Sequence, residues 1–92
     1  MVESMHTAAY AALIEAVVQI RHEAGLTQRQ LADHLGREQS FVGRIETGQR
    51  RIDLVEFVWI CKACGADPQE EINRLVSRIA RQVPGRSRRR SR

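Results

Sequence analysis

The sequence predicts an all-α fold, a single compact domain of five helices. Apolar residues recur at steps of three or four positions, which is the period of an amphipathic helix. Glycines and helix-capping residues divide these apolar stretches into five segments. No segment alternates apolar and polar residues with the period of two that a half-buried strand shows.

The first three helices are expected before residue 48. The first carries an apolar stripe at helical spacing, formed by Tyr10, Leu13, Val17, Ile20 and Ala24. Gly25 suits a left-handed helix end, and Thr27 suits the N-cap of a second helix over residues 28–35. Gly36 ends that helix, and a third is expected over residues 39–47, with its apolar side chains facing inward.

Two more helices and a tail complete the predicted organisation. Asp53 suits the N-cap of a fourth helix, whose inner stripe is Phe57, Ile60, Cys61 and Cys64. Asp67, Pro68 and Glu70 form a typical start for a fifth helix, whose apolar positions are Ile72, Leu75, Val76, Ile79 and Val83. We therefore expect an N-terminal extension (1–9), a five-helix domain (10–83) and an Arg-rich tail (84–92).

The charge of the chain is concentrated in two places. The whole chain has a net charge of +4, but five arginines lie among residues 86–92, and residues 1–85 carry ten Arg and Lys against eleven Asp and Glu. A second basic cluster of five arginines lies between residues 28 and 51. The tail contains only Arg and Ser after Gly85, so we expect it to be disordered, a basic arm that is able to contact phosphates.

Several classes of protein are not expected. The longest apolar stretch is too short to span a bilayer, and Lys and Arg are absent from its upstream flank, so we expect a cytoplasmic protein. The sequence has no paired carboxylates, nucleophile with a base, or phosphate-binding glycine loop, and it is not expected to be an enzyme. We expect no cofactor and no small-molecule ligand.

Cys61 and Cys64 have the CxxC spacing that occurs in zinc sites and in redox motifs. A zinc site needs two further ligands, and the three histidines do not supply a pair at suitable spacing. We therefore expect two reduced, largely buried and metal-free thiols, with Cys64 in the place of a core leucine.

Residues 28–46 carry the feature that points to function. Two short helices joined by a tight glycine turn, the second of them basic, describe a helix-turn-helix. Ala32 is small enough for the second helix to cross closely above it, and Gly36 supplies the positive φ that the turn needs.

The sequence resembles the phage repressor/Cro-like (XRE-type) helix-turn-helix regulators from about residue 17 to residue 75. The segments that carry the resemblance are IRHEAGLTQRQLADHLG, QSFVGRIETGQRRID and FVWICKACGADP. Arg37 departs from the family pattern, in which many members have an apolar residue after the turn glycine. The resemblance implies a compact, repressor-like domain that binds double-stranded DNA and regulates transcription.

The resemblance also implies roles for individual residues. The base-reading side chains on the third helix would be Gln39, Ser40 and Arg44. The residues expected to contact phosphates are Gln28, Arg29, Arg37, Phe41, Arg50 and Arg51. Arg29 and Arg37 fit a solvated surface charge equally well, and Phe41 could instead pack against the following loop. Arg21 and Glu46 are expected to form a partly buried ion pair between the first and third helices.

A homodimer on a palindromic operator is the leading interpretation, because one module of this size buries little surface on DNA. The candidate dimer surface is Trp59, Val76, Ile79 and Val83, although the residues of the fifth helix could simply cover the first. The alternative is a protein-interaction module, such as an antitoxin that binds a toxin or a component that recruits another regulator, with DNA binding secondary.

Overall fold

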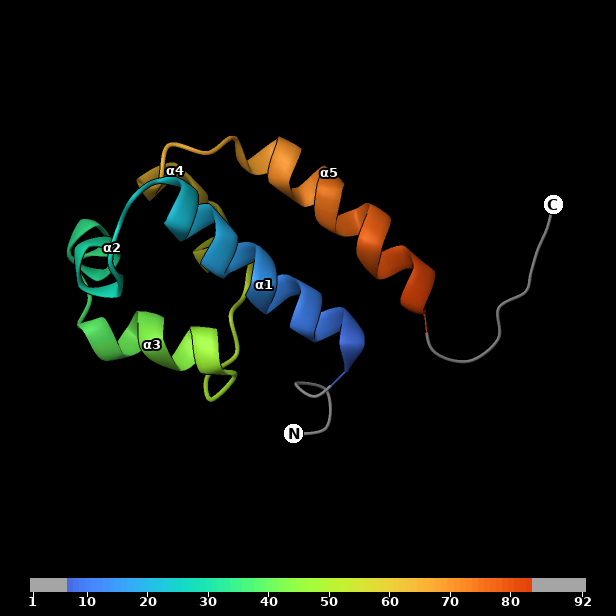
Figure 1. Ribbon diagram of the computed structural model, residues 1–92, viewed down its shortest axis with the longest axis horizontal. Coiled ribbons are helices and arrows are strands. Elements are labelled where there is room, and N and C mark those ends of the chain that lie inside the picture. Colours follow the sequence, from blue (N-terminus) through green and yellow to red (C-terminus); the bar gives the residue numbers. More distant parts are fainter. Residues whose placement is uncertain (1–6, 84–92) are drawn as a thin grey trace, which may run out of the picture.

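The computed structural model describes residues 7–83, which form five α-helices and no strand (Figure 1). The helices are α1 (Ala8–Glu23), α2 (Gln28–Leu35), α3 (Gln39–Thr47), α4 (Leu54–Ala63) and α5 (Pro68–Ile79), and a 3-10 turn, Ala80–Gln82, follows α5. The predicted all-α fold is confirmed, and α2 and α3 have the bounds expected from the sequence. The expectations for residues 1–6 and for the Arg-rich tail (84–92) lie outside the described residues.

Polar side chains cap the first turn of four of these helices and so determine where each begins. The capping residues, whose side chains accept hydrogen bonds from backbone N–H groups, are Thr7, Thr27, Asp53 and Asp67. Thr27 with Gln30, and Asp53 with Glu56, form complete capping boxes. Because Thr7 caps it, α1 starts at Ala8, inside the segment expected to be an extension.

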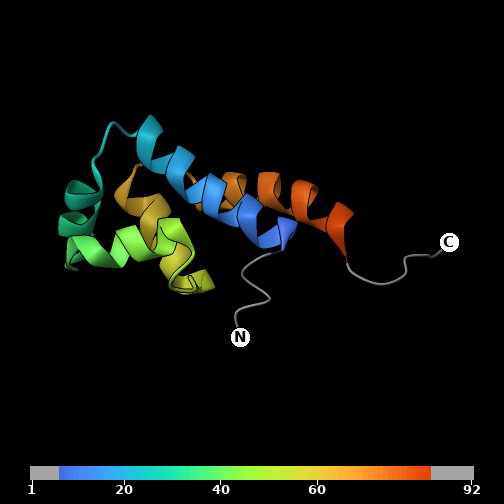
Figure 2. The ribbon, with the colours of Figure 1, turned by 60° about the horizontal axis from the view of Figure 1, so that its bottom comes forward.

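α1 lies at the centre of the fold, with α5 alongside it and α3 and α4 packed against it (Figure 1). α2 and α3 lie at one end, away from the C-terminal end of α5 (Figure 2). The largest side chains with no appreciable exposed surface come from all of the first four helices: Val17, Leu31, Val42, Ile45, Ile60 and Cys61. Each large one stabilises the fold by about 1.5–3 kcal/mol relative to exposure. No helix within residues 7–83 combines the length and apolar composition needed to cross a bilayer.

The loop between α3 and α4 is tied down at both ends. Gly48 has a φ of 81°, and this left-handed turn lets the backbone N–H of Gln49 donate to the carbonyl of Arg44 over 2.8 Å. Farther along, the backbone N–H of Ile52 donates to the hydroxyl of Tyr10 over 3.0 Å, in a buried bond between the loop and α1. The two attachments fix the intervening Arg50 and Arg51 beside α3.

The two cysteines of α4 and its C-cap have different surroundings. Cys61 is fully buried, whereas Cys64, the C-cap residue, is only partly buried; both are free thiols. Burial raises the pKa of Cys61 to about 11. No three or more His, Cys, Asp or Glu side chains are grouped to hold a metal ion among residues 7–83. Cys64 is thus less buried than a core leucine would be, since α4 ends just before it.

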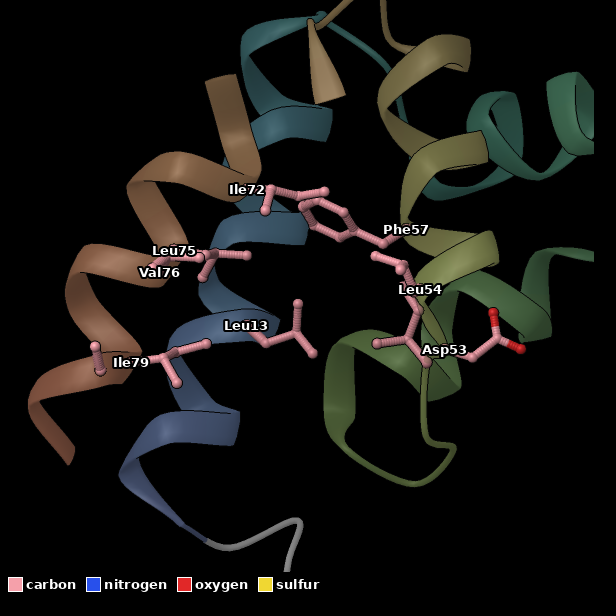
Figure 3. A pocket seen from close by; sticks show the side chains of 10 residues that line it. Leu13, Asp53, Leu54, Phe57, Ile72, Leu75, Val76 and Ile79 are labelled. Carbon is pink, nitrogen blue, oxygen red and sulfur yellow. The ribbon is translucent and has the colours of Figure 1, made fainter. Parts of the chain in front are cut away.

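An apolar groove opens between α1, α4 and α5 (Figure 3). Its volume is about 380 Å³, and its walls include Leu13, Leu54, Phe57, Leu75, Val76 and Ile79. Leu54 is 67% exposed and Val76 is 56% exposed. Large apolar side chains exposed together on a small domain are typical of a contact surface.

The residues expected to form one dimer surface lie in different places. Val76 and Ile79 line the apolar groove, whereas Trp59 lines a separate hollow with His34 and Leu35 of α2. Trp59 and Val83 are both exposed. Successive turns of α4 direct Leu54 and Trp59 to different sides of the helix, and the sequence stripe alone could not show which side faces α5.

Candidate nucleic-acid interface

The turn between α2 and α3 sets the angle at which α3 crosses the domain. Gly36 adopts a φ of 67°, and the backbone N–H of Arg37 donates to the carbonyl of Ala32 over 2.9 Å. Ala32 has no exposed surface, since α3 packs closely over α2 at this position. A side chain at Gly36 would meet no neighbour, so the backbone conformation alone favours glycine there.

α3 has one buried face and one exposed face. Val42 and Ile45 have no exposed surface and anchor the helix in the core. Gln39, Ser40 and Arg44, the three expected base readers, are all exposed. Ser40, in the first turn of α3, and Arg44, in its last turn, line one polar hollow, whereas Gln39 is exposed but does not line it.

The expected ion pair between α1 and α3 is present. Arg21 Nε lies 2.7 Å from Glu46 Oε2, and Arg21 Nη2 donates to Glu46 Oε1 over 2.9 Å. The two side chains are only 11% and 6% exposed. Arg21 Nη1 also donates to the carbonyl of Leu26. The hydrogen bond to Glu46 raises the pKa of Arg21 above its ordinary value.

A chain of hydrogen bonds continues from this ion pair to the exposed face of α3. Gln28 Nε2 donates to Glu46 Oε1 over 2.9 Å, and Gln39 Nε2 donates to Gln28 Oε1 over 2.9 Å. A Cβ atom at Gly43 would lie 3.4 Å from Gln28 Oε1, at the limit of ordinary van der Waals contact. Gln28, expected to contact phosphate, is therefore also the link between the ion pair and Gln39.

Phe41 is mostly buried in the structure. Its exposure is 8%, which fits packing against the loop, the alternative that the sequence left open, better than the expected contact with phosphate. The guanidinium carbons of Arg37 and Arg50 lie 3.9 and 4.7 Å from the centroid of its ring. Such stacking attracts each cation by about 0.5–1 kcal/mol at an exposed site.

Arg50 is held a second time by an acidic residue of α4. Its Nη1 and Nη2 donate to the two carboxylate oxygens of Glu56 over 3.0 and 2.9 Å. The hydrogen bond from Arg50 lowers the pKa of Glu56, although burial of the carboxyl opposes this effect. The sequence analysis did not predict this pair, because residues six positions apart come into contact here only through the fold of the loop. The Asp53–Glu56 capping pattern was the one sequence feature that pointed to a structural role for Glu56.

The basic residues do not all converge on one place. Arg37, Arg44 and Arg50 line a single polar hollow with Ser40 and Glu38. Arg29 is exposed on α2 and does not line this hollow. Arg51 also lies outside the hollow and places its guanidinium carbon 4.9 Å from the ring centroid of Tyr10. Three expected phosphate-contacting residues, Gln28, Arg29 and Arg51, therefore do not line it.

Comparison with known proteins finds a matching family and a similar solved structure. Residues 15–75 match the family described as helix-turn-helix domain. The structure is similar to that of an XRE-family like protein from Pseudomonas syringae pv. tomato str. DC3000, with a TM-score of 0.75 and 39% sequence identity. The similarity covers 83% of this chain and 93% of that one. None of the curated proteins compared with the chain matches it significantly.

Proposed function

The chain belongs to the XRE-type helix-turn-helix family of DNA-binding transcription regulators, and from this premise we propose that it is a sequence-specific repressor. It inserts α3 into the major groove of double-stranded DNA as a homodimer on a palindromic operator. The observation that carries this proposal is the division of α3, whose Val42 and Ile45 are completely buried while its opposite face is exposed.

The exposed face has the chemistry that base recognition needs. Arg44 can donate two hydrogen bonds to the O6 and N7 atoms of guanine, and Gln39 can pair in the same way with adenine. Ser40 can donate or accept. Each good bidentate pair discriminates against a wrong base by about 1–3 kcal/mol.

Phosphate contacts from the basic residues around α3 would set the register of the protein on the duplex. Arg29 and Arg37 are exposed at or before the turn, and Arg50 and Arg51 follow α3 in the anchored loop. These contacts carry no base information, so removing them weakens binding to all sequences alike.

Selection from random DNA followed by footprinting tests the proposal and gives the half-site and its spacing. Arg44→Ala is expected to relax preference at one base pair, whereas the matched variant Arg29→Ala is expected to weaken operator and random DNA equally. Repression is tested separately, by placing the selected site over a promoter and measuring transcription. Failure to bind any duplex would reject the proposal and favour a protein partner as the main target.

The apolar groove is proposed as the surface that holds the second subunit. An isologous interface uses the same self-complementary patch on both subunits. A groove beside protruding side chains meets this condition, and Leu54 and Val76 are more than half exposed while lining the groove. In this arrangement Leu54 of each copy enters the groove of the other. Trp59 is assigned no part in this contact, because it lines a different hollow.

Adjacent residues supply a matched test of this interface. Leu54→Glu is expected to shift the protein toward monomer in analytical ultracentrifugation, because it places a charge in an apolar contact. Val55→Glu is the control, since Val55 is 54% exposed but does not line the groove. Equal effects of the two variants, or a wild-type protein that is monomeric on its operator, would reject the groove as the interface.

A further inference from the structure

We propose that Phe41 is a positioning residue that holds Arg37 and Arg50 over one hollow, and that this hollow binds a single phosphodiester group of the DNA backbone. The inference rests on the proposed DNA-binding function and adds to it a defined site. It also gives the buried aromatic ring of α3 a role other than core packing.

The hollow has the charge of an anion site and is large enough to admit a phosphate group. Its volume is about 380 Å³, and three arginines line it, Arg37, Arg44 and Arg50, together with the hydroxyl-bearing Ser40. Glu38 is the acidic residue in the lining. The local charge stays positive even when Glu56 is counted against Arg50. The guanidinium groups of Arg37 and Arg50 suit phosphate, since each presents a planar array of N–H donors, while Arg44 keeps its proposed role in base reading.

The ring of Phe41 explains why these like charges stay together. Its centroid is 3.9 Å from the guanidinium carbon of Arg37 and 4.7 Å from that of Arg50. Both cations are attracted by the electron-rich face of the ring, and this attraction offsets part of their mutual repulsion. The ring is itself fixed, because Phe41 is 8% exposed and its neighbour Val42 is completely buried.

Arg50 keeps donors available for a ligand despite its ion pair. A guanidinium has five N–H donors. Arg50 uses three of them, two from Nη1 to Glu56 and the carbonyl of Arg51 and one from Nη2 to Glu56. Two donors remain, one on Nη2 and one on Nε. Glu56 therefore orients the arginine without consuming its capacity to bind an anion.

Restraining Arg37 and Arg50 in the free protein is expected to strengthen phosphate binding. A free arginine side chain loses rotamer entropy when it is immobilised on a ligand, and this loss weakens binding. Stacking on Phe41 restrains Arg37, and stacking together with the ion pair restrains Arg50, so much of that loss occurs on folding instead. The site is thereby prepared for phosphate before the DNA arrives.

The test compares changes at Phe41 with a change in the core away from the hollow. Phe41→Leu keeps an apolar side chain but removes the aromatic face, and it is expected to lower affinity for operator and random DNA by the same factor, about tenfold if both stacking interactions are removed. The slope of log K against log salt is expected to become shallower by about 0.9, the value for one phosphate contact. Phe41→Tyr, which retains the aromatic face, is expected to restore both affinity and slope.

Ile60→Val is the control, because Ile60 is buried in α4 and lines neither the hollow nor the apolar groove. It is expected to lower the melting temperature while leaving the salt slope unchanged. If Phe41→Leu does not fold, Arg37→Gln, at an exposed position, is expected to produce the same decrease in slope. An unchanged slope in a folded Phe41→Leu or Arg37→Gln protein overturns the inference, whereas a wild-type protein that binds no DNA overturns the proposed function instead.

Discussion

Replacing Glu46 with alanine is expected to remove a large part of the stability of the domain. The carboxylate accepts two hydrogen bonds from Arg21 and one from Gln28, and its side chain is only 6% exposed. Glu46→Ala leaves the guanidinium of Arg21 largely buried with the carbonyl of Leu26 as its remaining backbone partner. Removing one member of a buried pair costs about 3–5 kcal/mol, because the other charge stays buried without compensation.

This magnitude can be compared with the whole stability of a small domain and with an exposed pair in the same chain. A single domain is stable by about 5–15 kcal/mol, so the expected decrease is a substantial fraction, equivalent to a fall in melting temperature of about 12 °C or more. Arg74→Ala is the control. It breaks a 2.8 Å pair with Glu71 in which Arg74 is 68% exposed, and such a pair contributes less than about 0.5 kcal/mol.

Urea unfolding followed by circular dichroism measures both variants, with Glu46→Gln as a milder change if Glu46→Ala fails to fold. The double variant Arg21→Met/Glu46→Leu completes a cycle with the corresponding single changes. The double variant is expected to lose about 2 kcal/mol or more less unfolding free energy than the two single variants lose together, because no charge is then left unpaired. A cost for Glu46→Ala below about 1 kcal/mol, or additive effects in the cycle, would refute the reasoning.

Three further outcomes are expected. The lowered pKa of Glu56 means that its ionised form stabilises the fold fully above its ordinary pKa of 4.5 and that this contribution is lost as the pH falls through the lowered value. Arg50→Met should therefore flatten the stability profile below that pH, and an unchanged profile would contradict the pairing. A thiol reagent at neutral pH should modify Cys64 before Cys61, because the thiol of Cys61 is fully buried and has a pKa of about 11. In urea both thiols should react. Mass spectrometry of the labelled peptides gives the order of modification, and labelling of Cys61 first would contradict the prediction. Deleting residues 86–92 should weaken the salt dependence of DNA binding by about 0.9 for each phosphate that the tail neutralises, while base preference survives, and an unaltered slope would mean that the tail does not touch DNA.

Local signals in the sequence were sufficient for the helices that carry the interface. Thr27 and Gly36 mark the ends of α2 through capping and a left-handed turn, both of which act within a few residues, so the predicted bounds were correct. The start of α1 was missed because Thr7 caps the helix before its first apolar stripe residue, Tyr10, is reached. The α-helical part of α5 ends at Ile79, earlier than its apolar spacing indicated.

Contacts between distant segments were harder to predict. Phe41 is contacted by Arg37 and by Arg50, and Arg50 lies in a loop that the bond between Ile52 and Tyr10 attaches to α1. None of these contacts leaves a periodic pattern in the sequence. Trp59 illustrates the same limit: an exposed aromatic residue was recognised as available for contact, but its position relative to α5 follows from helix packing and not from its own stripe.

The position of Glu46 connects the stability of the domain with the proposed reading of bases. Arg21 fixes the carboxylate, the carboxylate fixes the amide of Gln28, and Gln28 Oε1 then accepts one N–H of Gln39. That bond leaves Gln39 with its carbonyl oxygen and a second N–H, the two groups that pairing with adenine requires. An unrestrained glutamine amide can rotate and present the same groups in the wrong order, so this chain of bonds favours one of the two orientations before DNA is met. Replacements at Glu46 that still fold should therefore reduce discrimination at the base pair read by Gln39 more than at the one read by Arg44.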